Sequence, residues 1–266
     1  MTGGRVGSVG CALTLLQVLG SDEGVAAGGK TVGELAAVVG RDKSQVSRML
    51  ATLADAGFAE RDPNTRRYRL GWQVFALAAR SGDQRLLSAA RPVLIRLVRE
   101  IGESSHLSVL RGGFVLTVFT ESPERALHTV SWVGRVVPPI ATSSGRALLV
   151  DHDRDQLLAV LGNATWQAPT PKAPRDVDEL LRRIQQARSC GYARVDEESE
   201  PGLVSVGAPV RDGGGRIVAA VNVSGPRFRL GKRLTATGET VAAAAADVSE
   251  RLGRPVSEPE REAALA

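Results

Sequence analysis

The amino-acid sequence predicts an α+β protein with a small N-terminal part and a larger C-terminal part. Two short helices, each with its own start signal, and a basic hairpin are expected within residues 31–70. Apolar residues at helical spacing predict helices over residues 72–101, and alternating patterns around paired glycines predict antiparallel strands after residue 104. Helices and antiparallel strands in separate stretches of one chain are typical of the α+β class.

The composition is that of a globular protein that needs no metal or cofactor to fold. The chain has 266 residues, of which 43% are hydrophobic and 24% charged, and its formal net charge is +5. This length can bury a core without disulfides or metals. The two cysteines and three histidines show no metal-binding spacing, and so few cysteines fit a reducing cytoplasm. We expect no cofactor and no metal.

The N-terminus predicts a buried helix rather than a targeting or membrane segment. Residues 9–19 are apolar, but Gln17 interrupts them and two acidic residues follow closely. No apolar run approaches the roughly 18 residues of a membrane span. Within a helix over residues 8–20, the apolar residues Val9, Leu13, Leu16 and Leu19 fall on one stripe, and this apolar face is expected to support dimerisation. A glycine-rich loop over residues 24–29 follows.

Two capping signals in close succession predict a helix-turn-helix. Thr31 and Glu34 have the spacing of a capping box, and Gly40 ends the short helix that they begin. Asp42 and Gln45 repeat the signal at once, and the second helix ends at Gly57. Its apolar residues recur at the i, i+3, i+4, i+7 spacing of a buried helix face: Val46, Met49, Leu50 and Leu53.

The other face of the second helix has the chemistry of a DNA-recognition helix. Gln and Arg side chains can read base edges in the major groove, while Ser and Lys can contact bases or phosphates. An ordinary solvated helix face is the alternative interpretation. The candidate DNA-binding residues of this helix are Lys43, Ser44, Gln45, Ser47 and Arg48.

A basic hairpin after this helix predicts a wing that contacts DNA. Residues 58–61 and 66–70 form two short strands around the turn 62–65, and Arg66 and Arg67 lie at its tip. Residues 41–69 contain seven Lys or Arg and four Asp or Glu, which leaves a net charge of +3 from the +5 of the whole chain. A polyanionic partner is therefore expected here. The alternative is that Arg61 and Arg69 pair with Glu60 and Asp62.

The order of these features resembles the DNA-binding domain of the IclR family of bacterial regulators. The resemblance is carried by the run TVGELAAVVGRDKSQVSRMLATLADAGFAERDPNTRRYRLG and extends to about residue 253. Val46 stands where the family often has Thr, so no base preference is transferred. The resemblance implies a winged helix-turn-helix joined by a helical linker to a GAF-like antiparallel-sheet sensor domain.

The pattern after residue 71 gives the remaining domain boundaries. We expect the DNA-binding domain at 1–71, a helical linker at 72–85, an effector-binding domain at 86–253 and a disordered tail at 254–266. Within the third segment, strands are predicted at 105–111, 114–120, 127–133, 203–211 and 216–224. Helices are predicted at 144–150, 176–190 and 232–252, and residues 162–175 are predicted to form a surface loop.

The resemblance also implies a pocket for a small polar or anionic effector. In the family, this pocket lies between the loop before a helix and a pair of strands. Val195 and Ser205 depart from the glyoxylate- and pyruvate-responsive founder of the family, so a glyoxylate-type effector is not expected. Residues 196–198, which are acidic, are interpreted as ordering a turn. The residues that the resemblance places in the pocket are Thr142, Ser143, Ser144, Gly145, Leu203, Ser205, Asn222 and Ser224.

The predicted function is therefore a cytoplasmic transcriptional regulator, and not an enzyme. Its expected partners are a double-stranded DNA operator, a small-molecule effector and further copies of itself, as a homodimer or a dimer of dimers; no membrane partner is expected. Catalysis needs a nucleophile with a base, a metal or paired acids, and no such motif is present. Two alternatives remain open: a dimeric sensor or interaction module that does not bind DNA, and a GAF-fold enzyme.

Overall fold

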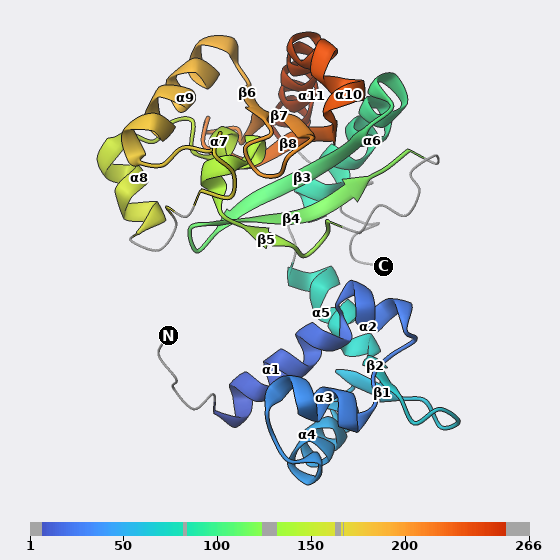
Figure 1. Cartoon of the computed structure of the whole chain (residues 1–266). Coiled ribbons are helices and arrows are strands. Elements are labelled where there is room, and N and C mark those ends of the chain that lie inside the picture. The colour runs from blue at the N-terminus through green and yellow to red at the C-terminus, as the bar shows by residue number, and fades with distance from the viewer. Residues whose placement is uncertain (1–6, 82–83, 124–131, 163–165, 167, 254–266) are drawn as a thin grey trace. The chain divides into compact units, whose positions relative to one another are not determined.

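A computed structural model describes residues 7–81, 84–123, 132–162, 166 and 168–253 (Figure 1). The chain divides into two compact units, Met1–Gln84 and Arg85–Ala266. The tail that was predicted at 254–266 lies outside the described residues. No helix of the described part is long and apolar enough to cross a membrane.

The first unit consists of helices and one small hairpin (Figure 1). In chain order its elements are α1 (Ser8–Leu19), α2 (Asp22–Ala26), α3 (Val32–Val39), α4 (Lys43–Asp55), β1 (Ala59–Arg61), β2 (Tyr68–Leu70) and α5 (Trp72–Ser81). The helix-turn-helix and the hairpin are thus present as predicted. Helix α2 occupies part of the stretch that was predicted to be a glycine-rich loop.

One of the two predicted capping boxes forms. At the start of α3, the Glu34 amide donates to the Thr31 hydroxyl at 3.3 Å, and the Thr31 amide donates to the Glu34 carboxylate at 2.7 Å. The hydrogen bond from the Thr31 amide is the main reason that the pKa of Glu34 lies below its ordinary value. At the start of α4 the prediction is wrong, since Asp42 is the N-cap residue but its side chain accepts no capping hydrogen bond.

The core of the first unit takes up Leu19 of the apolar stripe indicated by the sequence, together with a second side of α1. Cys11, Leu15 and Leu19 are buried, whereas Val9 and Leu13 are 75% and 56% exposed. Helix α1 is apolar on more than one side, so its own periodicity does not determine which side faces the core. The buried stripe packs with residues of α3, α4 and the hairpin: Leu35, Ala36, Val46, Leu50, Ala59 and Tyr68.

The second unit is built on one antiparallel sheet with the strand order β5-β4-β3-β8-β7-β6. Its strands are β3 (Ser104–Arg111), β4 (Phe114–Glu121), β5 (Val136–Val137), β6 (Ala193–Asp196), β7 (Leu203–Arg211) and β8 (Ile217–Pro226). Its helices are α6 (Gln84–Ile101), α7 (Ser143–Leu148), α8 (Arg154–Leu161), α9 (Val177–Cys190), α10 (Arg227–Leu230) and α11 (Leu234–Gly253), with 3-10 turns η1 (Pro139–Ala141) and η2 (Gly231–Arg233).

Most predicted elements of this unit are present, with three differences. The strand predicted at 127–133 falls mainly outside the described residues, and its last two, Trp132 and Val133, are not in a strand. Strands β5 and β6 and helices α8 and α10 were not predicted. The loop predicted at 162–175 is not wholly on the surface, because Thr170 and Ala173 are buried.

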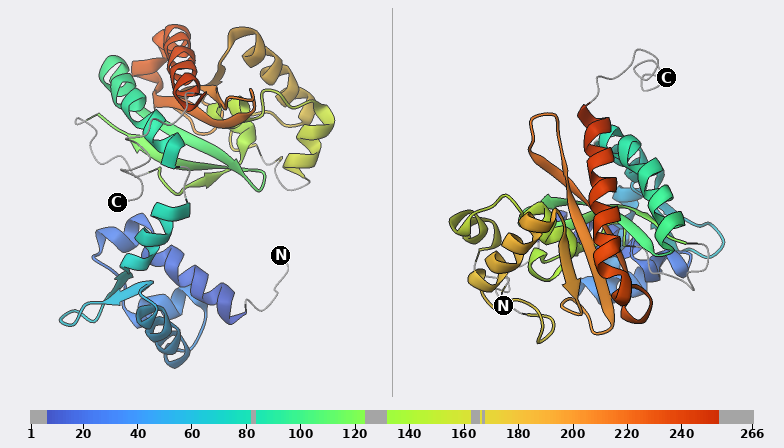
Figure 2. Two further views of the ribbon diagram at one scale, coloured as in Figure 1. Left: turned by 180° about the vertical axis from the view of Figure 1, so that it is seen from behind. Right: turned by 90° about the horizontal axis from the view of Figure 1, so that it is seen from above.

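The two faces of the central strands have different partners, because successive side chains of a strand point to opposite faces. One face is apolar and packs against α6 and α11, which lie side by side in Figures 1 and 2 and are joined by an ion pair between Arg96 and Asp247 at 2.6 Å. The other face holds small and polar side chains and lies against α7. Gly207 permits this approach, since a Cβ atom there would lie 2.8 Å from the Ser143 backbone.

Candidate functional site

The polar face of α4 presents the predicted DNA-binding side chains to solvent. Val46 and Leu50 are fully buried, which turns the opposite side of the helix outward. On that side Lys43, Ser44, Ser47 and Arg48 are exposed, and Gln45 is half-buried. Within the described part of the chain, Lys43 and Arg48 form no ion pair. Their cationic groups are therefore available to phosphates or base edges.

The wing separates its two tip arginines. The Arg67 guanidinium donates to the Gly29 carbonyl at 2.8 Å and pairs with Glu34 at 3.4 Å, so it ties the hairpin to the start of α3. Arg66 is exposed, and its guanidinium has no partner among the described residues. Arg69 pairs with Glu60 at 2.9 Å, as the alternative interpretation of the wing proposed. Arg66 is thus better placed than Arg67 to contact DNA.

The turn of the wing is held by one carboxylate. Asp62 accepts hydrogen bonds from the amides of Asn64 at 2.9 Å and Thr65 at 2.7 Å. These hydrogen bonds, above all the one from Thr65, hold the pKa of Asp62 below its ordinary value. Arg66, which follows, has a φ of 56°, a left-handed conformation that a tight turn imposes here.

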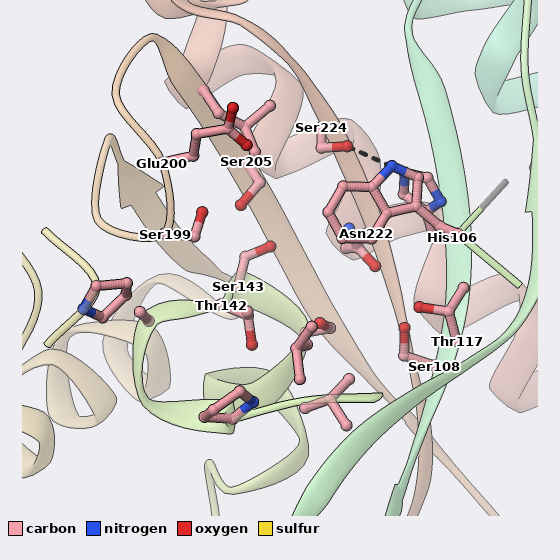
Figure 3. Close-up of a pocket in the computed structure, with 18 of the residues that line it drawn as sticks. His106, Ser108, Thr117, Thr142, Ser143, Ser199, Glu200, Ser205, Asn222 and Ser224 are labelled. Atoms are coloured by element: carbon pink, nitrogen blue, oxygen red, sulfur yellow. Dashed lines mark hydrogen bonds between the residues drawn. The ribbon is translucent and has the colours of Figure 1, made fainter. Parts of the chain in front are cut away.

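A cavity of about 300 Å³ lies between the polar face of the sheet and the segment that leads into α7 (Figure 3). This is at the lower end of the range for small-molecule sites. Its apolar wall includes Val115, Val137, Ile140 and Leu203. The remaining lining residues are His106, Ser108, Thr117, Trp132, Pro138, Ala141, Thr142, Ser143, Ser144, Pro169, Ser199, Glu200, Ser205, Asn222 and Ser224.

The fold brings seven of the eight predicted pocket residues to this cavity. The exception is Gly145, which does not line it; a Cβ atom there would lie 2.3 Å from the Pro139 carbonyl oxygen, so Gly145 instead allows α7 to pack on η1. Thr142 lines the cavity, and its hydroxyl also caps α7 by accepting from the Gly145 amide at 3.1 Å. Val195, at the position of a carboxylate in the family's founder, is fully buried and does not line the cavity.

Three polar lining residues that sequence reasoning missed come from β3 and β4. His106 and Ser108 are two residues apart and share one face of β3. Thr117 is paired with Ser108 across the β3–β4 ladder, and Asn222 is paired with His106 across the β3–β8 ladder. The sequence pattern that could have identified the β3 residues is the alternation of polar side chains at 104, 106 and 108. Only the strand order of the folded sheet, however, brings His106 and Ser108 beside Asn222.

His106 is a neutral hydrogen-bonding group of the cavity. One ring nitrogen lies 3.0 Å from the Thr120 hydroxyl. The other lies 3.0 Å from the Ser224 hydroxyl, as the dashed line in Figure 3 shows. Burial lowers the pKa of His106 to about 4. The imidazole is therefore uncharged near pH 7, and it fixes the orientation of Ser224. The Trp132 ring meets it edge-on at 6.0 Å between centroids.

A buried ion pair joins α7 to the loop that borders the cavity. The Arg146 side chain is 1% exposed, and Glu198, with which it pairs, is 5% exposed. Arg146 also donates to the carbonyls of Ile140 at 3.1 Å and Arg194 at 2.9 Å. Residues 199 and 200, which line the cavity, directly follow Glu198. Arg146 thus holds three segments around the cavity in one arrangement.

The other two acidic residues of the 196–198 stretch are engaged at the surface. Asp196 pairs with Arg227 at 3.0 Å, and Glu197 pairs with Lys172 and accepts from the Gly202 amide at 2.9 Å. These contacts order the turn between β6 and β7, as predicted. Among the residues that the structure describes, no cluster of three His, Cys, Asp or Glu side chains could hold a metal ion.

Two family models cover most of the chain. Residues 8–63 match the IclR helix-turn-helix domain, and residues 80–250 match the C-terminal domain of IclR bacterial transcriptional regulators. The chain belongs to the IclR family. It is accordingly a DNA-binding transcriptional regulator, and the helix-turn-helix described above is the DNA-binding module of that family.

Individual relatives agree with the family. The HTH-type transcriptional regulator BhcR of Paracoccus denitrificans is 31% identical over 251 residues, which are 92% of this chain and 87% of BhcR. The crystal structure of an IclR transcriptional regulator from Alicyclobacillus acidocaldarius covers 94% of this chain and 100% of its own, with 26% identity and a TM-score of 0.75. An IclR homolog of Microbacterium hydrocarbonoxydans, complexed with 4-hydroxybenzoate, shares the fold, with a TM-score of 0.77 at 22% identity over 92% of this chain and 98% of its own.

Proposed function

We propose that this regulator reads a DNA operator with α4 and that a small molecule in the cavity of the second unit changes its affinity for that operator. The observation that carries the first part is the exposed polar face of α4, opposite the buried Val46 and Leu50. The residues proposed to contact DNA are Lys43, Ser44, Gln45, Ser47, Arg48, Arg66 and Arg67, with Arg67 partly committed to Glu34.

The cavity supports the second part of the proposal. It is enclosed by several segments of the chain, and a ligand that fills it changes the contacts of all of them. The effector-binding residues proposed are Thr142, Ser143, Ser144, Leu203, Ser205, Asn222 and Ser224, with His106, Ser108 and Thr117 added from the structure. A ligand changes DNA occupancy only if it binds one conformation more tightly than another. We propose this regulatory role, and no catalytic one, for the cavity.

The protein is proposed to act in the cytoplasm as a homodimer or a dimer of dimers. Val9 and Leu13 support self-association, because they leave exposed apolar surface on α1 beside the core of the first unit. Two copies related by two-fold symmetry would match a palindromic operator. The domain limits proposed are 1–71 for DNA binding, 72–85 for the linker and 86–253 for the effector domain.

Two arginine variants test the DNA surface. If Arg48 reads a base, Arg48→Ala weakens specific binding by about 1–3 kcal/mol and relaxes the preference for the operator. Arg66→Ala, if it removes a phosphate contact, weakens binding to all sequences alike and makes binding less dependent on salt. Arg154→Ala is the control, since that exposed arginine pairs with Asp178 in the second unit.

The assay is a gel-shift titration against the regions that flank its own gene, at two salt concentrations, with excess nonspecific DNA. A discrete shift that survives the competitor supports the proposal. If Arg48→Ala and Arg66→Ala have equal effects on intact and mutated operators, the roles assigned to α4 and the wing are wrong.

A further inference from the structure

Three buried oxygen atoms in the cavity have no hydrogen-bond partner within the described part of the protein. They are Ser108 Oγ, Ser143 Oγ and Asn222 Oδ1. Ser108 and Ser143 are 1% exposed, and Asn222 is 8% exposed. A buried polar group without a partner destabilises the folded protein. All three residues line the same cavity, where Figure 3 shows Asn222 across from Ser143, so the cavity carries an unmet demand for hydrogen bonds.

The pairing of the strands explains why these groups lie together. His106 is opposite Asn222 in the β3–β8 ladder, and Ser108 is opposite Ala220. Asn222 is therefore the diagonal neighbour of Ser108 on the same face of the sheet. Ser224, next along β8, is already engaged by His106 at 3.0 Å. One side of the cavity thus presents a fixed cluster of hydroxyl and amide groups.

The charge of the cavity disfavours an anion. The described lining residues include one acidic side chain, Glu200, and no Lys or Arg, and burial keeps His106 neutral near pH 7. A ligand carboxylate that entered this cavity would lose its hydration and find no cation to pair with. It would also be repelled by the Glu200 carboxylate. A neutral amide or hydroxyl group loses much less hydration free energy on burial. It can donate a hydrogen bond to Asn222 Oδ1 and form hydrogen bonds with the hydroxyls of Ser108 and Ser143.

We propose that the effector is an uncharged small molecule whose amide or hydroxyl group pairs with Ser108 and Asn222, while an apolar ring or chain fills the space beside Val115, Val137 and Ile140. This inference rests on the proposed function of the cavity. It narrows the expected ligands from polar or anionic metabolites to uncharged ones. It also assigns the hydrogen-bonding end of the ligand to the sheet side of the cavity.

The first test measures the thermal stability of the ligand-free full-length chain. Ser108→Ala removes a buried hydroxyl that has no partner, so its melting temperature is expected to rise. Ser105→Ala is the matched control on the same strand, because the Ser105 hydroxyl is also buried but donates to the Leu94 carbonyl at 3.2 Å. Its melting temperature is expected to fall. A comparable fall for both variants would overturn the claim that Ser108 is kept for a ligand.

The second test compares two probes of nearly the same shape, benzamide and benzoate, by ligand-observed NMR and calorimetry at pH 7.5. Benzamide is neutral and has an N–H donor, whereas benzoate is an anion. We expect benzamide to bind at least ten-fold more tightly than benzoate. Asn222→Leu and Ser108→Ala are expected to weaken the affinity for benzamide at least ten-fold and about three-fold, whereas Arg154→Ala, at an exposed position that does not line the cavity, changes it less than two-fold.

The outcomes separate this inference from the proposed function. Benzoate binding as tightly as benzamide, or binding of neither probe, overturns the uncharged ligand class. Operator binding by the same preparation tests the regulatory function independently of both probes. A protein that shifts operator DNA but prefers benzoate retains the proposed function and loses the inference. A protein that prefers benzamide but binds no DNA retains the ligand class and loses the function.

Discussion

Replacement of Glu198 by Gln is the sharpest test of how the cavity is held together. The substitution keeps the shape of the side chain and removes its charge. Arg146 would then remain buried, with its side chain 1% exposed, and without its counter-charge. Arg183, which pairs with Glu198 at 2.7 Å, would become a second unpaired guanidinium beside it. Both consequences act in the same direction, because like charges repel most strongly where water is excluded.

The expected loss of stability is about 3–5 kcal/mol, the usual cost of removing one partner of a buried ion pair. Burial is the main reason that the pKa of Arg146 lies below its ordinary value, and the bond to Glu198 opposes that effect. Arg183→Ala is the matched control, since Arg183 is 34% exposed. A partly solvated pair of this kind contributes about 1 kcal/mol or less.

The assay is urea unfolding of the full-length protein at pH 7, followed by circular dichroism and tryptophan fluorescence. Two transitions are allowed for in the fit, because the chain has two compact units. The loss is expected in the transition of the second unit alone. A cost below about 1 kcal/mol for Glu198→Gln, or a cost equal to that of Arg183→Ala, would refute the reasoning.

Two further substitutions test the cavity. Burial lowers the pKa of His106 from 6.5 to about 4. As the pH falls, the imidazole of the unfolded chain is therefore protonated before that of the folded chain. The folded state loses up to about 3 kcal/mol of stability between pH 6.5 and 4. His106→Gln should therefore flatten the dependence of the melting temperature on pH in this window, and an unchanged slope would contradict the burial of a neutral imidazole. Gly207→Ala should cost about 1–3 kcal/mol by overpacking, because its Cβ atom would meet the backbone of α7 at 2.8 Å. Gly213→Ala, whose nearest neighbour would be 3.9 Å away, should cost much less, and equal melting temperatures would argue against this close approach.

The sequence predicted the first unit well where the deciding interactions are local. The capping box at Thr31 and Glu34 depends on residues three apart, and it forms as predicted. The spacing of Val46 and Leu50 correctly indicates the buried face of α4 and hence its polar face. The prediction failed at Asp42, where a favourable residue type does not ensure that the side chain makes the hydrogen bond.

The sequence was less informative where a segment has more than one apolar side. Helix α1 has apolar residues around much of its surface. Of the stripe that begins at Val9 only Leu19 is fully buried, and Cys11 and Leu15 complete the buried side. Which stripe is buried depends on the position of α3 and α4. The short strand β6 and the short helix α8 were missed for a related reason, since each contains too few residues to establish a period.

The residues of the candidate cavity likewise fall into two groups: those that the sequence indicated and those that depend on contacts between distant segments. Thr142, Ser143, Asn222 and most of the other residues that the resemblance placed in a pocket line one cavity. The resemblance missed His106, whose role depends on its partners in β4 and β8, segments that are 14 and 118 residues away in the chain. The resemblance likewise gave no indication that Ser108, Ser143 and Asn222 lack hydrogen-bond partners.

By itself, the sequence determined the class of the protein, the face of α4 that meets solvent and the turns that join its hairpins. These features depend on hydrogen bonds and spacings between residues that are close in the sequence, and such interactions do not depend on the position of distant segments. Only the tertiary structure decided which strands are neighbours, which stripe of α1 is buried and which polar groups meet in the cavity. Those outcomes depend on packing between distant segments, and a sheet face becomes a binding site only when its strands are aligned in one register.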